Sequence, residues 1–160
     1  MAERLGLAVI PGVGWSAGEV QAIAREAEDA GFDAIFAAEV NNDVMATAQL
    51  MGTATPTFIG DDLDAVRETA RQNLVLYTGL PFFQRLFRAS GFADEADQME
   101  RGNGLASLSD RLLDAICLLG PLDRCRDHLA TFRAAGVDLP ILYPPVGLEG
   151  ARSVMRAFRR

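Results

Sequence analysis

Two apolar runs flank a segment of helical periodicity in the first forty residues, and this pattern restricts the fold more than any other feature. Residues 5–11 are continuously apolar, which is typical of a strand buried on both faces. Ser16 and Glu19 have the spacing of a capping box, and the helical pattern continues to Gly31, a residue type that ends helices. Residues 32–40 predict a second strand. A strand, a helix and a strand within about 36 residues predict parallel strands joined by a right-handed crossover, and hence an α/β fold.

The remaining residues predict further helices and two more strands, which gives about three to four parallel strands and six to seven helices in all. Helices are expected over 43–55, 63–77, 93–101, 109–118, 120–136 and 148–158, and strands over 57–60 and 137–145. Between the expected helices over 63–77 and 93–101 lies an apolar cluster, which is more typical of a core or a subunit contact than of a ligand pocket. Its members are Phe82, Phe83, Leu86 and Phe87.

Composition excludes several classes of function. The formal charge is -7 and all 15 basic residues are arginines. An acidic chain is a poor nucleic-acid binder, and without lysine it cannot use a Schiff base or a P-loop. No apolar run is as long as a signal peptide or a membrane span requires, so we expect a soluble cytoplasmic protein that has no membrane partner. We expect Cys117 and Cys125 to be reduced and to pack in the interior, in preference to forming a disulfide.

Three segments carry a likeness to a known family. The segment "LGLAVIPGVGWSAGEVQAIAREAEDAGFDAIFAAEV" resembles the first βαβ unit of the luciferase-like oxidoreductases, which use flavin or deazaflavin. The segment "LGPLDRCRDHLATFRAAGVDLPILYPP" is similar to the closing part of that family, and "DDLDAVRETARQNLVLYTGLPFFQRLFRASGF" to the helical region before it. Full-length members are (β/α)8 barrels of about 250 to 350 residues. The resemblance therefore implies a single domain over 1–160 that is an incomplete barrel, in which residues 1–55 hold the first two βα units and 56–160 the late region.

The resemblance also implies where a cofactor would bind. In a barrel the active site lies on the loops that follow the carboxyl ends of the strands. The cofactor-binding residues implied here are Pro11 and Gly12 after the first strand, and Glu39, Asn41 and Asn42 after the second. The sequence leaves open whether Asn42 serves instead to cap the next helix. It assigns no catalytic residue and no metal ligand.

Other candidate residues have a structural interpretation beside the functional one. The glycines at 12, 14 and 18 do not have the G-x-G-x-x-G spacing of a dinucleotide fingerprint. Trp15 could stack on an aromatic ligand, but a hydrophobic staple before the Ser16 cap is favoured. His128 has no second histidine to form a triad or metal site. A structural role is favoured for Tyr77 and Arg85, although their segment approaches the barrel mouth in the relatives.

Two functions follow as hypotheses. The first is an oxidoreductase or monooxygenase that uses reduced FMN or a deazaflavin coenzyme on a small-molecule substrate, with activity impaired if the central barrel is missing. The second is a non-catalytic truncated homologue that acts as a dimerising or binding protein. Because a partial barrel leaves strand edges without partners, both hypotheses predict a homodimer or association with a related subunit.

Overall fold

The protein is an α/β sandwich built on one parallel sheet. The computed structural model describes residues 4–9, 17–37 and 54–159. Five strands form the sheet in the order β2-β1-β5-β3-β4, and every pair in it is parallel. The strands are β1 Gly6–Val9, β2 Ala34–Ala37, β3 Ala54–Ile59, β4 Leu118–Gly120 and β5 Ile141–Tyr143.

The predicted βαβ unit is confirmed. Helix α1 (Ala17–Asp29) connects β1 to β2, and the two strands pair in parallel from Gly6 beside Ala34 to Val9 beside Ala37. All four residues of β1 are buried. An alternating pattern would leave one face of the strand polar, so the continuous apolar run correctly predicted a strand that is covered on both faces.

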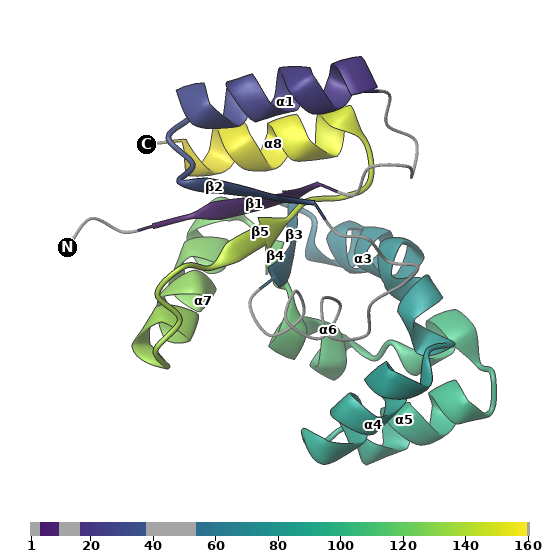
Figure 1. The fold of residues 1–160 in the computed structure, drawn as a ribbon. Helices are drawn as coiled ribbons and strands as arrows, with labels where there is room; N and C mark the ends of the chain where they lie inside the picture. The colour runs from purple at the N-terminus through teal and green to yellow at the C-terminus, as the bar shows by residue number, and fades with distance from the viewer. Residues whose placement is uncertain (1–3, 10–16, 38–53, 160) are drawn as a thin grey trace.

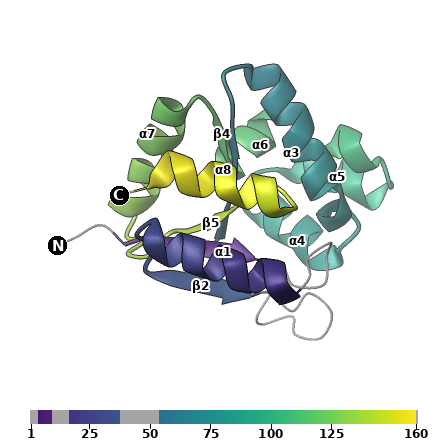
Figure 2. The same ribbon diagram turned by 90° about the horizontal axis from the view of Figure 1, so that it is seen from above.

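Helices cover both faces of the sheet (Figures 1 and 2). One face carries α1, α7 (Leu122–Ala134) and α8 (Leu148–Phe158), which share a core with β1, β5 and the start of β4. The other face carries α3 (Leu63–Thr78) and α6 (Asp110–Ile116) against β3 and β4. Helices α4 (Pro81–Ala89) and α5 (Ala93–Glu100) pack on each other beyond α3. A short 3-10 helix, Gly104–Ser107, follows them.

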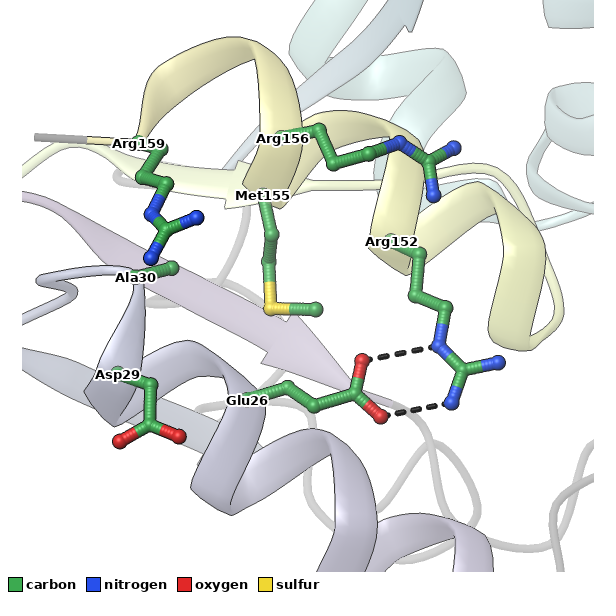
Figure 3. Close-up of a pocket in the computed structure, with 7 residues that line it drawn as sticks. All are labelled: Glu26, Asp29, Ala30, Arg152, Met155, Arg156 and Arg159. Carbon is green, nitrogen blue, oxygen red and sulfur yellow. Dashed lines mark hydrogen bonds and ion pairs between the residues drawn. The ribbon is translucent and has the colours of Figure 1, made fainter.

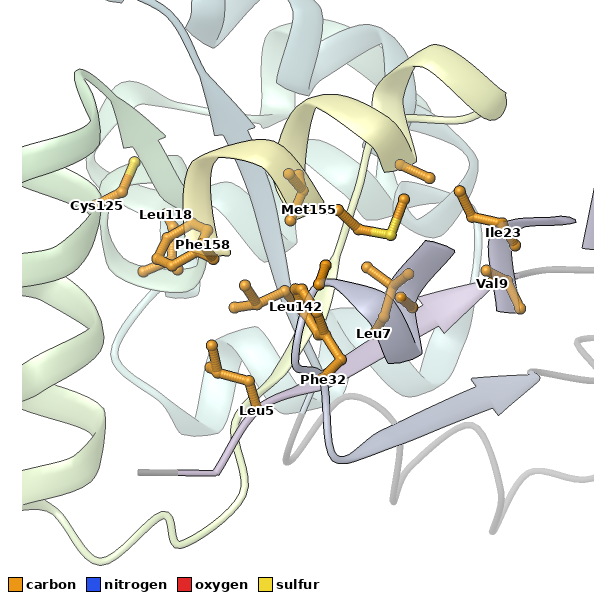
Figure 4. Close-up of a cluster of buried hydrophobic side chains, with 14 of the residues drawn as sticks. Leu5, Leu7, Val9, Ile23, Phe32, Leu118, Cys125, Leu142, Met155 and Phe158 are labelled. Atoms are coloured by element: carbon orange, nitrogen blue, oxygen red, sulfur yellow. The ribbon is translucent and has the colours of Figure 1, made fainter. Parts of the chain in front are cut away.

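The sheet separates two hydrophobic cores. In the first core, Leu7 and Leu142 of the central strands meet Met155 and Phe158 of α8 (Figure 4). In the second core, Phe58 of β3 packs among the helices on the opposite face. Phe83 and Phe87 are buried in this second core, so their predicted role as core residues is confirmed, whereas Leu86 is 37% exposed.

Strand number and boundaries differ from the expectation at three places. Helix α6 ends at Ile116 and the chain extends at Cys117 into β4, where the sequence predicted a helix continuing to residue 118. Three residues are too few to show a strand period beside a helical one. Ala54 and Thr55 belong to β3 and not to the end of a helix, and β5 spans only Ile141–Tyr143 of the expected 137–145. Residues 43–53 of the predicted second helix lie outside the described residues.

Five strands therefore replace the expected three to four, and the described part of the chain has seven α-helices. The parallel α/β fold is confirmed. The partial barrel remains a prediction. Strand β3 lies between β4 and β5, which follow each other in the chain, whereas consecutive strands of a barrel are neighbours. Within the described strands, β2 and β4 form the two edges of the sheet.

Candidate functional site

Strands β1, β2 and β5 end at one common edge of the sheet, the carboxyl edge. Val9 pairs with Ala37 at the ends of β1 and β2, and Leu7 pairs with Leu142 of β5. The three strands therefore end at the same edge of the sheet. In open parallel sheets, ligands bind outside the carboxyl ends of the strands.

The five residues predicted to bind the cofactor lie outside the described residues. They are Pro11, Gly12, Glu39, Asn41 and Asn42. Trp15 and Ser16 also lie outside. The described residues that precede these segments, Val9 and Ala37, pair with each other, and β1 also pairs with β5.

Two tyrosines meet at this edge. Tyr143 is the last residue of β5, and its hydroxyl oxygen lies 3.5 Å from the hydroxyl oxygen of Tyr77 on α3. Asn73 is one helical turn before Tyr77, so both side chains lie on the same face of α3. The Asn73 carboxamide oxygen accepts a hydrogen bond from the backbone N–H of Val146 at 3.0 Å. Helix α3 thus holds both the end of β5 and the turn that follows it.

The tyrosine pair is a neutral hydrogen-bonding group. Burial raises the pKa of Tyr143 far above the ordinary range of a phenol, and the adjacent Tyr77 raises that pKa further. The Tyr143 hydroxyl therefore stays protonated at physiological pH. It can donate a hydrogen bond to a carbonyl or amide oxygen, but it cannot act as a general base.

A small apolar pocket adjoins the tyrosine pair. Tyr77 and Pro56 line it together with Leu74 and Phe87, and its volume is about 80 Å³. Ligand pockets usually measure about 300 to 1,000 Å³. This pocket therefore has room for a small group and not for a three-ring cofactor.

Other chemistry-bearing groups are inert or isolated. Cys117 and Cys125 are free and buried, as predicted for packing residues. Burial raises the pKa of the Cys125 thiol to about 11. Burial, and to a smaller extent the charge of Asp114, raises the pKa of the Cys117 thiol beyond the ordinary range. The ring of His128 stacks on Phe132 at 4.8 Å. Residues 4–9, 17–37 and 54–159 contain no group of three or more metal-ligating side chains.

Sequence reasoning found part of this edge and missed the rest. It singled out Tyr77 but favoured a structural role, and it did not single out Tyr143 or Asn73. A phenol as the last residue of a buried strand, immediately before two prolines, was the available signal for Tyr143. Arg85 is exposed on α4 and does not line the pocket beside Tyr77.

Comparisons with known proteins add no family assignment. No family model, curated protein or solved structure matches the chain. None of the helices in the described part of the chain is both long and apolar enough to cross a bilayer.

Proposed function

We propose that the chain is an oxidoreductase of the luciferase-like type that binds reduced FMN or a deazaflavin coenzyme and acts on a small-molecule substrate. The observation that carries the proposal is the common carboxyl edge of β1, β2 and β5, from which both predicted cofactor segments depart. A partial barrel fold belongs to the same proposal. The sequence resemblance supports the cofactor class, and the shared carboxyl edge of the three strands supports this location.

The described residues do not hold such a cofactor by themselves. Their pocket at this edge measures about 80 Å³, which is too small for an isoalloxazine or deazaflavin ring. Binding therefore depends on the predicted contacts after β1 and β2, and we assign no chemical step to the cofactor. Tyr143 has a narrower role in the proposal, because its protonated hydroxyl can donate to a ligand oxygen at the edge of the sheet.

Titration of the purified chain with FMN and with the deazaflavin coenzyme tests the proposal. A change in visible absorbance or fluorescence is expected at cofactor concentrations of tens of micromolar. The Tyr143→Phe variant should bind more weakly, because it loses the hydroxyl but keeps the ring. Thr131→Val is the matched control, since it removes an exposed hydroxyl that bonds only to the His128 carbonyl on α7. Absence of binding to either cofactor would refute the oxidoreductase assignment.

A second candidate function is a non-catalytic dimerising protein, and the edge strand β2 favours it. Its four residues, Ala34–Ala37, include no charge and no proline, and Ile35 is 38% exposed. Natural sheets usually protect an edge with charges, prolines or bulges. In the described part of the sheet, β2 pairs only with β1. Two copies could therefore pair β2 with β2 about a two-fold axis, which would make one continuous sheet.

Light scattering separates this candidate from a monomer. The wild-type chain is expected to have the mass of a dimer, and Ile35→Lys the mass of a monomer, because the charge would be buried at the paired edge. Leu76→Lys is the control, since Leu76 is 67% exposed on α3 and not on β2. A folded wild-type monomer, or an Ile35→Lys dimer, would rule out pairing through β2.

A further inference from the structure

The turn between α5 and the 3-10 helix carries the sequence Gly102-Asn103-Gly104, and no part of the proposed function uses it. The chain has four asparagines, at positions 41, 42, 73 and 103, and only Asn103 is followed by a glycine. The side-chain carboxamide of an asparagine before glycine is the one that the next backbone nitrogen reaches most easily, because glycine has no Cβ atom to hinder the approach. The sequence therefore points to this turn as a site of covalent modification.

Asn103 is exposed, and its backbone N–H is held at the end of α5. Gly102 has a φ of 77°, and its N–H donates to the Met99 carbonyl at 2.9 Å. The Asn103 N–H donates to the Gln98 carbonyl at 3.0 Å. These two bonds form the Schellman motif that ends many helices. The carboxamide of Asn103 lies at the surface, where its nitrogen donates to the side-chain oxygen of Gln98.

The backbone nitrogen of Gly104 is accessible. Gly104 is the first residue of the 3-10 helix, so its N–H comes before the hydrogen bonds of that helix begin. In the described part of the chain, this N–H has no acceptor. A methyl group on Gly104 would meet only Val75 Cγ2 within 4 Å, at 3.9 Å. Neither a hydrogen bond nor crowding therefore holds this nitrogen away from the Asn103 side chain.

We propose that Asn103 is a site of spontaneous deamidation. The backbone nitrogen of Gly104 loses its proton and attacks the Cγ atom of Asn103. A C–N bond forms, and the carboxamide nitrogen takes up a proton and leaves as ammonia, so that a five-membered succinimide ring remains. Water then opens the ring at one of its two carbonyl carbons. Opening at Cγ gives aspartate, and opening at the backbone carbonyl carbon gives isoaspartate, in which the chain continues through the former side chain.

The turn has to rotate before this attack. Asn103 has a ψ of 2°, and ring closure needs a rotation about that bond to bring the Gly104 nitrogen toward Cγ. The rotation breaks the hydrogen bond from the Ala106 N–H to the Asn103 carbonyl, which is 3.0 Å long. Because this bond belongs to a single surface turn, local opening is sufficient and the domain stays folded. Folding therefore slows the reaction but does not prevent it.

The modification changes both the charge and the path of the chain. Either product adds a negative charge to a protein whose formal charge is already -7. Isoaspartate also inserts a methylene group into the backbone and displaces the carbonyl that accepts from Ala106. The 3-10 helix leads to Leu108, which is buried and whose carbonyl accepts a hydrogen bond from Arg71 of α3 at 3.0 Å. We therefore expect the isoaspartate form to be less stable than the aspartate form.

Ageing of the purified full chain at physiological temperature, followed by tryptic mapping and mass spectrometry, tests the proposal. Trypsin cuts only after arginine in a chain without lysine, so Asn103 lies in peptide 102–111 and Asn73 in peptide 72–85. Relative to a sample taken at the start, peptide 102–111 should gain aspartate and isoaspartate forms, and faster as the pH is raised. Peptide 72–85 should convert at least about tenfold more slowly, because Asn73 precedes Leu74 within α3 and its reaction requires that helix to open.

Two variants make the result specific. Asn103→Gln keeps a carboxamide at the surface, but its attack would close a six-membered ring, which forms much more slowly, so its peptide 102–111 should stay unmodified. Asn103→Asp has the added charge without the added methylene, so its urea midpoint should exceed that of the purified isoaspartate form. An unmodified peptide 102–111 in the aged wild type, equal conversion of Asn73, or the same acidic species from Asn103→Gln would overturn the proposal. Equal urea midpoints would contradict the expected loosening of the 3-10 helix.

Discussion

Substitution of Gly120 by alanine should destabilise the junction between β3, β4 and α7. Gly120 ends β4 with a φ of 97°, in the left-handed region that favours glycine. Its carbonyl accepts a hydrogen bond from the Gly60 N–H at 3.0 Å, which ties β4 to β3. A methyl group here would lie 3.1 Å from Leu63 Cδ1 and 3.3 Å from Arg124 Cδ. The substitution therefore adds crowding to backbone strain.

Backbone strain and crowding at residue 120 both destabilise the folded state. An L-residue in the left-handed region costs roughly 1–2 kcal/mol. The two short contacts require Leu63 and Arg124 to move by a few tenths of an ångström, which costs about 1 kcal/mol more. We expect the free energy of unfolding to fall by about 2–3 kcal/mol, a large part of the roughly 5–15 kcal/mol that stabilises a domain.

Urea denaturation followed by circular dichroism measures this loss. Gly91→Ala is the matched control, because Gly91 has a φ of 89° and a methyl group there would meet no atom within 4 Å. It should lose only the strain, about 1–2 kcal/mol. The expected order of midpoints is wild type, Gly91→Ala, then Gly120→Ala, with equal slopes. A Gly120→Ala variant as stable as Gly91→Ala would refute the crowding, and one as stable as the wild type would refute the strain also.

Three further predictions concern buried polar groups. Burial would raise the pKa of Glu95, but hydrogen bonds from Ser109 and Arg111 outweigh it and hold that pKa below the ordinary value of a glutamate. Glu95 therefore stabilises the fold above the ordinary glutamate pKa, and this contribution is lost as the pH falls and the carboxylate is protonated. Glu95→Gln should lower the free energy of unfolding by about 1–3 kcal/mol at pH 7, and the stability of the variant should then depend less on pH between 3 and 7. Urea midpoints over this pH range measure both effects, and a pH dependence equal to that of the wild type would contradict this role of Glu95. Cys117 and Cys125 should resist iodoacetamide at pH 8 in the folded chain and react in urea, as mass spectrometry would show, whereas rapid native labelling would contradict their burial. The raised pKa of Tyr143 should keep its ultraviolet phenolate band absent at pH 10.5, and a full phenolate signal from both tyrosines there would exclude the buried pair.

The parts of the fold that sequence predicted are those with strong local signals. The continuous apolar run of β1 and the long helical pattern of α3 each gave nearly their observed bounds. The start of α7 was predicted to within two residues, because proline suits the first positions of a helix: α7 begins at Leu122, and Pro121 is its N-cap. These signals reside in neighbouring residues, so no knowledge of tertiary contacts was needed.

The missed elements depend on contacts that are distant in sequence. Strand β4 has three residues, and it is recognisable as a strand only through its pairing with β3 at Leu118 beside Thr57. The order of strands has the same origin, because nothing local in β5 indicates that it inserts between β1 and β3. Tertiary packing determines which strands are neighbours, which strands lie at the edges and which face of the sheet each helix covers. A single sequence does not indicate these features directly.

The candidate site divides in the same way. The carboxyl edge followed from the βαβ pattern, and the pairing of Val9 with Ala37 agrees with it. The tyrosine pair could not be predicted, because Tyr77 and Tyr143 are 66 residues apart and meet only when α3 packs over β5. The ion pair between Glu26 and Arg152 (Figure 3) has the same cause, because it joins α1 to α8 across 126 residues.

Mapping FMN onto the backbone by nuclear magnetic resonance tests most directly whether the carboxyl edge is the ligand site. Amide signals of the 15N-labelled chain would be followed while FMN is added, and the deazaflavin coenzyme would be added in a parallel titration. We predict saturable shifts at the amides of Val9, Ala37 and Tyr143, which end the three strands at that edge. Shifts confined to Asp29 and Arg159, at the ends of α1 and α8, or no saturable shift with either cofactor, would contradict a cofactor site at the carboxyl edge.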